Sequence, residues 1–173
     1  MIKTRKENSE VLYPTESFVS LDGDDLNQMK NMAKLNDRHR IRICTHLNID
    51  DEVHEMIIYH PKDTYVAPHK HVSKVESFHL ICGEIILILF NESGKISKVL
   101  EMGEIGTGKT FYYRIPAGTY HTQIFKEDTF FHEVTEGPFD KKDSIVAEWA
   151  PNGKDSQLVT KFLTKIKNKY SGN

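Results

Sequence analysis

The chain has 173 residues and a mass of 20.0 kDa, the size of one folded domain with a substantial core. Hydrophobic residues make up 38% and charged residues 28%, and the net charge of −2 disfavours both a disordered chain and a nucleic-acid-binding protein. The sequence contains neither a secretory signal nor an apolar run of the ~20 residues that a membrane-spanning helix needs. We therefore expect a cytoplasmic protein with no nucleic-acid or membrane partner, in which Cys44 and Cys82 remain free thiols.

The first expected element is a helix over residues 22–38. Asp22 or Asp24 can cap its N-terminus, and apolar residues recur at helical spacing between positions 26 and 33. Residues 1–40 are therefore predicted to form an N-terminal helical extension of the domain.

From residue 41 the pattern changes to short stretches rich in β-branched and aromatic residues, separated by Gly, Pro, Asn or Asp. These stretches predict ten strands, at residues 41–46, 53–60, 65–69, 75–82, 85–90, 96–102, 110–115, 121–125, 129–135 and 145–149. The Asn-Glu-Ser-Gly sequence at 91–94 predicts a hairpin turn between two of them. Many short strands are typical of a sandwich or barrel, which we place at residues 41–151.

The last predicted element is an amphipathic helix within residues 152–173. Its apolar face consists of Leu158, Val159, Phe162, Ile166 and Tyr170. Four lysines lie largely around the opposite side, and we interpret them as a solvated face. The three segments together are predicted to form a single compact domain.

Three histidines and one glutamate indicate a metal site. His69 and His71 are two residues apart, and side chains at that spacing share a face where the chain is extended, so the two imidazoles can point together into the barrel. Glu76 begins the next apolar strand, where an unpaired carboxylate is costly to bury, and a cation would explain its position. His121 follows a Pro/Gly turn at the start of a later strand. Three imidazoles and one carboxylate form a plausible ligand set for a transition metal.

A second motif matches a nucleotide-binding loop, and we reject nucleotide binding as its function. Residues 103–110, Gly-Glu-Ile-Gly-Thr-Gly-Lys-Thr, match the Walker A pattern of nucleotide-binding loops. That loop needs a helix beginning at its Lys-Thr to hold phosphate. The residues that follow, 111–116, are aromatic, β-prone and end in proline. We expect a glycine-containing connection between strands.

The histidine motifs resemble those of the cupin family. His-x-His at 69–71 is followed after four residues by Glu76 and after six more by Gly83, and Pro-x-Gly-x-x-His occurs at 116–121. This resemblance implies an all-β fold, the cupin double-stranded β-helix (jelly roll), with N- and C-terminal helices. It also implies a metal held by His69, His71, Glu76 and His121.

A narrower resemblance, to the WbuC-family cupin-fold metalloproteins, covers roughly residues 40–151. The segments that carry it are Arg42 to His46, Asp50-Asp51, Thr64 to His71, Glu133 with Gly137-Pro138-Phe139, and Trp149-Ala150-Pro151. That family is associated with bacterial surface-polysaccharide gene clusters. The resemblance therefore implies a role in polysaccharide biosynthesis and a carbohydrate-type ligand.

His46 and Glu133 are the candidate catalytic residues. His46 shares one face of its strand with Arg42 and Cys44, and this polar row either lines the metal pocket or faces solvent while the alternating isoleucines form the core. Glu133 lies on a strand expected to flank the pocket, and its alternative role is a surface salt bridge. Either side chain could transfer a proton near the metal.

The ligand set favours certain metals. Four mixed nitrogen and oxygen ligands leave two positions on an octahedral ion, which favours iron, manganese or nickel over zinc, although zinc is possible. The metal would bind a carbohydrate or small organic acid, for isomerisation or epimerisation. The alternatives are a non-catalytic sugar-binding cupin and an iron-dependent dioxygenase. By analogy with other cupins we expect a homodimer.

Overall fold

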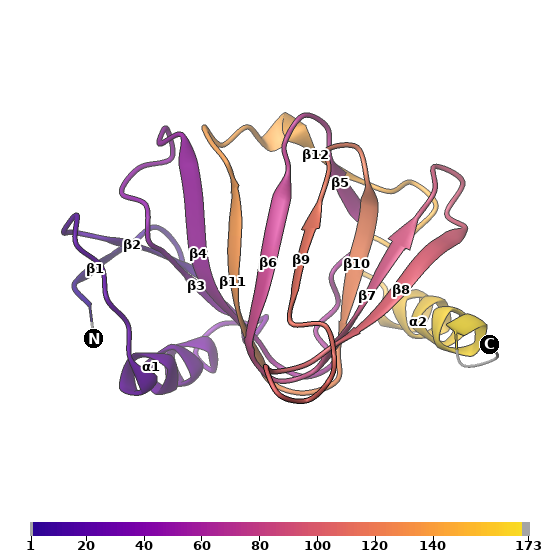
Figure 1. The fold of residues 1–173 in the computed structure, drawn as a ribbon, viewed down its shortest axis with the longest axis horizontal. Helices are drawn as coiled ribbons and strands as arrows, with labels where there is room; N and C mark the ends of the chain where they lie inside the picture. Colours follow the sequence, from indigo (N-terminus) through magenta and orange to yellow (C-terminus); the bar gives the residue numbers. More distant parts are fainter. Residues whose placement is uncertain (1, 171–173) are drawn as a thin grey trace.

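The structure is a computed structural model that describes residues 2–170, and of Tyr170 only the backbone. It consists of two β-sheets with one helix at each end (Figure 1). The larger sheet contains, in spatial order, β1 (Thr4–Lys6), β2 (Val11–Pro14), β3 (Ile41–Cys44), β4 (Val53–His60), β11 (Thr129–Glu136), β6 (Glu76–Cys82) and β9 (Tyr112–Ile115). The smaller sheet contains β12 (Ser144–Val146), β5 (His69–His71), β10 (Tyr120–Phe125), β7 (Ile85–Phe90) and β8 (Ile96–Met102). The helices are α1 (Gly23–Ala33), α2 (Ser156–Tyr170) and the short 3-10 helix η1 (Lys141–Asp143).

The facing sides of the two sheets form the main core, and the predicted all-β jelly roll is confirmed. Side chains alternate along each strand, so that Glu76, Phe78 and Leu80 of β6 point inward between the residues that point outward. Phe78 stacks on Phe131 of β11 at a ring distance of 4.3 Å and on Tyr113 of β9 at 4.9 Å. Fully burying an aromatic side chain of this kind stabilises the fold by roughly 1.5–3 kcal/mol.

A second core lies between α1 and the outer side of the larger sheet. Met29 and Ala33 of α1 pack on Ile41 and Ile43 of β3. The alternate residue Cys44 belongs to the main core inside the barrel. Both faces of β3 are therefore buried, so the isoleucines form a core and the polar row faces the barrel interior.

The sequence expectations differ from the structure at the N-terminus. Asp22 caps α1 as expected, accepting hydrogen bonds from the backbone of Asp24 and Asp25, but α1 ends at Ala33. The chain turns there because the Asn36 side chain donates to the backbone carbonyls of neighbouring segments. The region expected as a helical extension also contributes β1 and β2, and β2 pairs parallel to β3. These strands are short, and pairing with their neighbours in the sheet stabilises them. Their residue pattern alone is therefore too weak to predict them.

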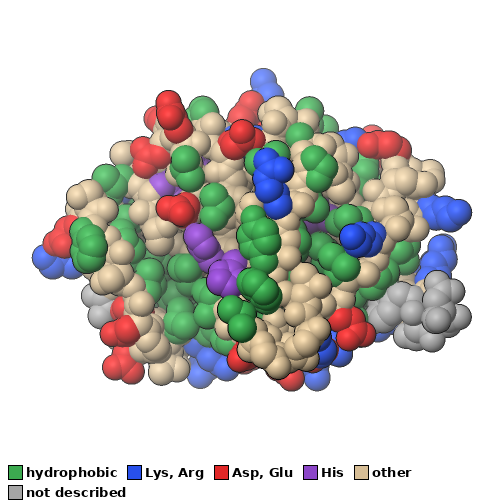
Figure 2. Space-filling view, viewed as in Figure 1, with side chains coloured by type: hydrophobic (Ala, Val, Ile, Leu, Met, Phe, Trp, Pro, Cys, Tyr) green, Lys and Arg blue, Asp and Glu red, His purple; other side chains and the backbone are tan. Residues whose placement is uncertain are grey.

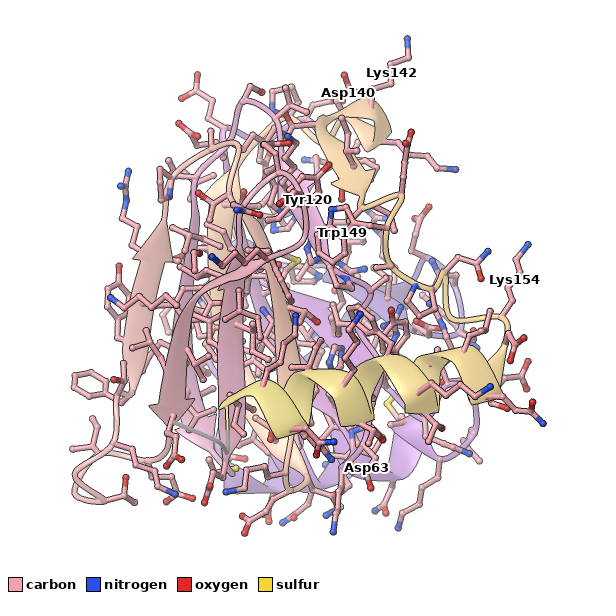
Figure 3. All side chains as sticks on the ribbon, turned by 90° about the vertical axis from the view of Figure 1, so that its right-hand side faces the viewer. Asp63, Tyr120, Asp140, Lys142, Trp149 and Lys154 are labelled. Carbon is pink, nitrogen blue, oxygen red and sulfur yellow. The ribbon has the colours of Figure 1, made fainter. Side chains whose placement is uncertain are left out.

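The third core joins α2 to the outer side of the smaller sheet. Phe162 and Ile166 of α2 pack with Ile86, Ile88 and the Trp149 ring. Figure 3 shows α2 crossing in front of this sheet, with Tyr120 and Trp149 above it. Four lysines of α2 are exposed, as predicted, namely Lys161, Lys165, Lys167 and Lys169.

α2 departs from the sequence pattern at one apolar position. Leu158 is exposed, and Leu163 packs in its place. Among the described residues neither helix has the length and apolar character needed to cross a membrane.

The Walker-like segment connects β8 to β9 as a series of turns, with no helix at its Lys-Thr. Lys109 forms an ion pair with Glu84 at 2.6 Å. The Lys109 side chain is thus held by a carboxylate. The segment also lacks the helix N-terminus that holds phosphate in a nucleotide-binding loop. The expectation of a strand connection is confirmed.

The outer face of the larger sheet carries mixed charge. Figure 2 shows histidine and apolar side chains near the centre of this face, with basic and acidic side chains scattered around them. Its exposed apolar residues include Ile81, Phe111 and Tyr112. No continuous basic stripe of the kind that binds nucleic acid crosses this view. Both cysteines are free, as expected.

Acidification should destabilise the fold through His60, and this can be tested. The His60 ring contacts Phe125 and Phe131 inside the barrel, its Nδ1 makes no hydrogen bond to any described residue, and burial lowers its pKa to about 3. The unfolded chain binds this proton near pH 6.5, so stability is complete above that pH and falls between about pH 6.5 and 3. In His60→Leu, the slope of the unfolding free energy against pH should decrease by up to about 1.4 kcal/mol per pH unit.

Urea unfolding at a series of pH values measures this slope. The exposed His39→Asn variant is the control and should keep the wild-type slope. An unchanged slope in His60→Leu would contradict a neutral buried His60.

Candidate metal centre

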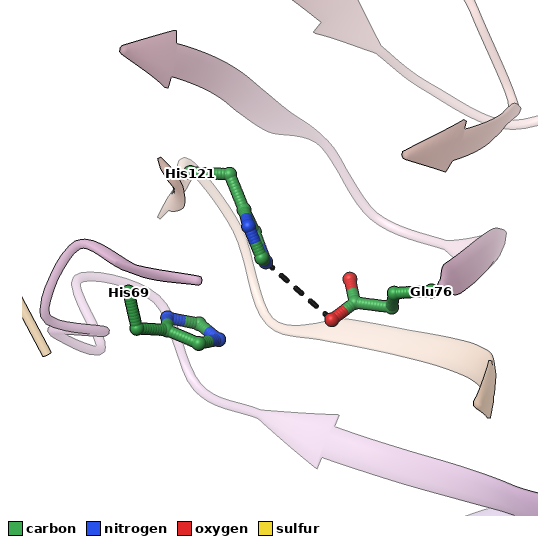
Figure 4. A group of neighbouring side chains, drawn as sticks. All are labelled: His69, Glu76 and His121. Atoms are coloured by element: carbon green, nitrogen blue, oxygen red, sulfur yellow. Dashed lines mark ion pairs between the residues drawn. The ribbon is translucent and has the colours of Figure 1, made fainter. Parts of the chain in front are cut away.

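Three side chains from three strands converge at one end of the barrel. His69 of β5 lies opposite His121 of β10 in the strand register, and Glu76 is the first residue of β6. Their potential ligand atoms all lie within 4.8 Å of one another (Figure 4). Glu76 is 3% exposed and His121 1% exposed, so both side chains lie in the interior of the barrel.

The backbone fixes which nitrogen each histidine presents. Nδ1 of His69 lies 3.0 Å from the carbonyl of Ala67, and Nδ1 of His121 lies 3.0 Å from the carbonyl of Thr119. Because a carbonyl only accepts, each Nδ1 must carry the proton, and in the neutral ring Nε2 then has the free lone pair. Nε2 of His121 is buried, makes no hydrogen bond within the described part of the chain, and faces Oε2 of Glu76 in the ion pair that the dashed line in Figure 4 marks.

Glu76 is held by a chain of hydrogen bonds. The hydroxyl of Tyr113 donates to Oε1 of Glu76 at 2.9 Å, and Nε2 of Gln123 donates to that hydroxyl at 2.8 Å. The other oxygen, Oε2, faces Nε2 of His121 at 3.4 Å. Tyr113 and Gln123 thus orient one carboxylate oxygen and leave the second directed at the cluster.

His71 lies beside this cluster on the Glu76 side. Its Nε2 is 3.3 Å from Oε2 of Glu76, whereas its ring centre is 5.6 Å from that of His69 and 6.3 Å from that of His121. Its Nδ1 is 3.5 Å from Oδ2 of Asp143. A carboxylate behind a histidine is a common support for a metal ligand. The compact group therefore contains three of the four predicted ligands, with His71 in contact with one of them.

The charge states of Glu76 and His69 suit a cation. The Glu76 carboxylate raises the pKa of His71, and at His121 it outweighs burial and raises the pKa as well, so an ion would displace protons from these two rings. Burial raises the pKa of the Glu76 carboxyl, but the neighbouring imidazoles of His121 and His71 outweigh it and hold this pKa well below its ordinary value. Burial lowers the pKa of His69 to about 4, so its ring is neutral. An ionised carboxylate and a neutral imidazole are the forms that bind metal.

The spacing of the ligand atoms agrees with a common ion. Ligand atoms about 2.1 Å from one ion lie about 3.0–3.4 Å apart, and the two distances at Oε2 of Glu76 are 3.3 and 3.4 Å. Nitrogen and oxygen donors of this kind suit a divalent transition metal. The buried Nε2 of His121, which faces Oε2 of Glu76 and makes no hydrogen bond within residues 2–170, is the observation that most directly fits such an ion.

Glu133 of β11 faces the same interior. Its neighbours in register are Phe78 and Met56, both in the main core, so its side chain shares their face. Burial, followed by the nearby Glu76 carboxylate, raises the pKa of Glu133 to about 7. Glu133 therefore lies in the barrel interior and does not form the surface salt bridge that was its alternative role.

His46 lies beyond the end of β3. Its ring stacks on His54 at 4.1 Å and meets Tyr13 edge-on at 5.4 Å, and its Nδ1 lies 3.1 Å from the backbone N–H of Glu55. Burial lowers its pKa. No contact found among residues 2–170 joins His46 to His69, Glu76 or His121, so its catalytic role stays a prediction.

Sequence reasoning missed the residues that support the ligands. Tyr113 and Gln123 flank the second histidine motif, three residues before Pro116 and two residues after His121, whereas Asp143 lies far from both motifs in the chain. Strand pairing brings Tyr113 to Glu76 and Asp143 to His71. Alternation along 112–115 could have placed Tyr113 inside the barrel, since Tyr113 and Ile115 share a face. No local signal identifies Asp143, which precedes the edge strand β12.

Comparison with protein families gives one match. A family model described as "Domain of unknown function (DUF6016)" matches residues 21–102. This range contains His69, His71 and Glu76 and ends before His121. No curated protein matches the sequence.

Solved structures with similar folds are cupin-fold proteins. CapF with the inhibitor 3-isopropenyl-tropolone has 17% identity and a TM-score of 0.50, over 65% of this chain and 33% of CapF. Oxalate decarboxylase from Bacillus subtilis has 18% identity and a TM-score of 0.48, over 62% of this chain and 27% of the enzyme chain. The cupin domain of Schizosaccharomyces pombe Cnp3 has 15% identity and a TM-score of 0.43, over 56% of this chain and 64% of that domain.

This chain covers less than two thirds of each of these three structures. At these identities the likeness concerns the fold. The chain is similar to cupin jelly rolls and carries a histidine and glutamate cluster inside the barrel. The narrower resemblance to the WbuC family has no counterpart among these matches.

The support of Glu76 by Tyr113 gives a prediction. Tyr113→Phe removes the hydroxyl that holds Oε1, and loss of such a supporting contact typically lowers metal affinity about 10- to 100-fold. Competition with a chelator of known affinity measures the change. Tyr112→Phe, which removes an exposed hydroxyl bonded to Ser77, is the matched control. Equal metal affinity in the wild type and Tyr113→Phe would show that this hydrogen bond does not orient the ligand.

Proposed function

We propose that this protein is a cupin metalloprotein that binds one divalent transition metal ion through His69, His71, Glu76 and His121. The observation that carries the proposal is the buried Nε2 of His121, which makes no hydrogen bond within residues 2–170 and faces Oε2 of the ionised, buried Glu76 at 3.4 Å. Burying a carboxylate against imidazoles is costly unless a cation neutralises it. Nitrogen and oxygen ligands favour iron, manganese or nickel, with zinc possible.

We further propose that the ligand is a carbohydrate or small organic acid and that the reaction is an isomerisation or epimerisation. The metal would supply Lewis-acid polarisation of a ligand oxygen. Glu133, inside the barrel, is the first candidate to remove and return a proton on carbon, since it shares its face with the core residues beside Glu76. His46, held beyond the end of β3, is the second candidate.

The biological setting is proposed from the sequence resemblance to WbuC-family proteins, which favours surface-polysaccharide metabolism in the cytoplasm by a homodimer. Two other functions fit the same cluster. A non-catalytic sugar-binding cupin would keep the metal and the ligand without turnover. An iron-dependent dioxygenase would use the same ligands to react with oxygen.

Metal binding is tested directly. Wild-type protein should hold close to one transition metal ion per chain by elemental analysis, and Glu76→Gln should lower this content at least tenfold. Because a ligand of the folded state stabilises it, a chelator should lower the Tm of the wild type and leave that of Glu76→Gln unchanged. His79→Gln, on the outer side of the same strand, is the control.

A wild type without metal after reconstitution would refute the proposal. Full metal content in His71→Ala would remove His71 from the ligand set and leave the compact group of three.

Proton transfer by Glu133 is tested with deuterium. Metal-loaded protein is incubated in D2O with a panel of nucleotide sugars and sugar acids, and mass spectrometry measures deuterium incorporated at carbon. Glu133→Gln should keep its metal and lose at least 100-fold in exchange rate, which is typical for removal of a general base. Glu55→Gln, an exposed residue on the neighbouring strand, should behave as wild type.

The same experiment separates the alternatives. Sugars that bind without exchange in the wild type would support the non-catalytic function. Oxygen consumption by the iron-loaded protein would support the dioxygenase.

A further inference from the structure

Arg42 places a positive charge inside the barrel. It lies on β3 opposite Ile58 of the main core, on the same face as Cys44. Its Nη1 is 3.5 Å from Sδ of Met56, and its side chain is half-buried. Met56 is the register neighbour of Glu133, so the guanidinium extends toward the end of the barrel that holds the metal centre.

No carboxylate neutralises this guanidinium. Within residues 2–170, no carboxylate oxygen lies within 4.0 Å of Arg42, whereas Arg5 pairs with Glu7, and Arg38 and Arg40 both pair with Glu10. The remaining arginine, Arg114, is exposed on β9. The sulfur of Met56 is a weak acceptor and offers little compensation for the lost hydration of a charged group. Arg42 is therefore an inward-facing cation whose donors have no anionic partner.

Glu133 does not supply that partner. The two residues are close enough for Arg42 to lower the pKa of Glu133, yet they form no ion pair. Glu133 is the register neighbour of Met56, which the guanidinium contacts, and of Phe78, two residues along β6 from Glu76, so it lies between the guanidinium and the metal centre. A ligand that contacts both Arg42 and the metal centre would pass Glu133.

We propose that Arg42 binds the carboxylate of a small acid whose other end ligates the metal ion. This inference rests on the metal site proposed above and narrows its ligand from a carbohydrate or organic acid to a carboxylic acid, a sugar acid included. A guanidinium presents donors in a planar fork that matches a carboxylate. A phosphate dianion fits less well, because a single cation faces it and the Glu76 and Glu133 carboxylates are nearby. A neutral sugar would leave the charge of Arg42 uncompensated.

The test uses cobalt-loaded protein, because the visible spectrum of cobalt(II) reports changes in its ligands. Two series of acids are titrated: the dicarboxylates oxalate, malonate, succinate and glutarate, and the monocarboxylates acetate, propionate, butyrate and valerate. One carboxylate can ligate the metal, and in a dicarboxylate of suitable length the second can reach Arg42. At least one dicarboxylate should bind tenfold or more tightly than the monocarboxylate of the same length.

Arg42→Gln should remove this advantage while the cobalt content, measured on every sample, stays at the wild-type value. Arg42→Lys keeps the charge without the planar fork and should retain part of the advantage, so it carries the test if Arg42→Gln fails to fold by circular dichroism. Arg114→Gln, the exposed arginine, is the matched control. Loss of cobalt from the wild type would overturn the metal site itself, which is distinguishable from loss of the anion site alone.

Two results would overturn the role of Arg42 with the metal in place. The first is equal affinity for dicarboxylates and monocarboxylates of the same length in the wild type. The second is a dicarboxylate advantage that survives in Arg42→Gln. Glucose binding that changes the cobalt spectrum equally in the wild type and Arg42→Gln, without a dicarboxylate advantage, would assign the site to neutral sugars.

Discussion

Burial of the Glu76 carboxylate is the constraint around which this barrel is organised. A carboxylate that is 3% exposed must be compensated on every side, because removing its hydration costs several kcal/mol. One oxygen receives the Tyr113 hydroxyl, and the other faces the imidazoles of His71 and His121. These partners come from β9, β5 and β10, so they surround the carboxylate only when both sheets are formed. Folding and assembly of the site are consequently one event.

The outer cores give this site its rigidity. α1 packs behind β3 and β4, and α2 packs behind the smaller sheet, so that each sheet is supported on the side away from the barrel. The contact between Gly94 and the Trp149 ring shows how tightly these segments pack. A side chain at Gly94 would place its Cβ 2.7 Å from the Trp149 ring, and the backbone of Gly94 has a φ of +76° that also favours glycine. Sheets supported in this way hold ligand atoms in place before any ion binds, which lowers the cost of binding.

The sequence predicted the parts of this arrangement that depend on local pattern. His69, Glu76 and His121 were identified from spacing and from the cost of burying Glu76, and the all-β class followed from the short alternating strands. The position of His71 was less well determined. The i, i+2 rule puts it on the same face as His69, but the distance between the two rings depends on how β5 is tilted between β10 and β12.

Contacts between distant segments were beyond local reasoning. Tyr113 reaches Glu76 only because β9 pairs with β6, and Arg42 lies inside only because α1 covers the isoleucines on the opposite face of β3. The alternation of Ile41, Arg42 and Ile43 was visible in the sequence, yet it could not show which face met the barrel. Both faces of β3 are buried, and a pattern rule that assumes one wet face fails for such a strand.

The inward-facing charges are the physical basis for proposing a carboxylic acid rather than a neutral ligand. A divalent ion at the histidines would be offset by the Glu76 and Glu133 carboxylates when both are ionised, which leaves the charge of Arg42 without a counterpart. A single ligand carboxylate would neutralise it.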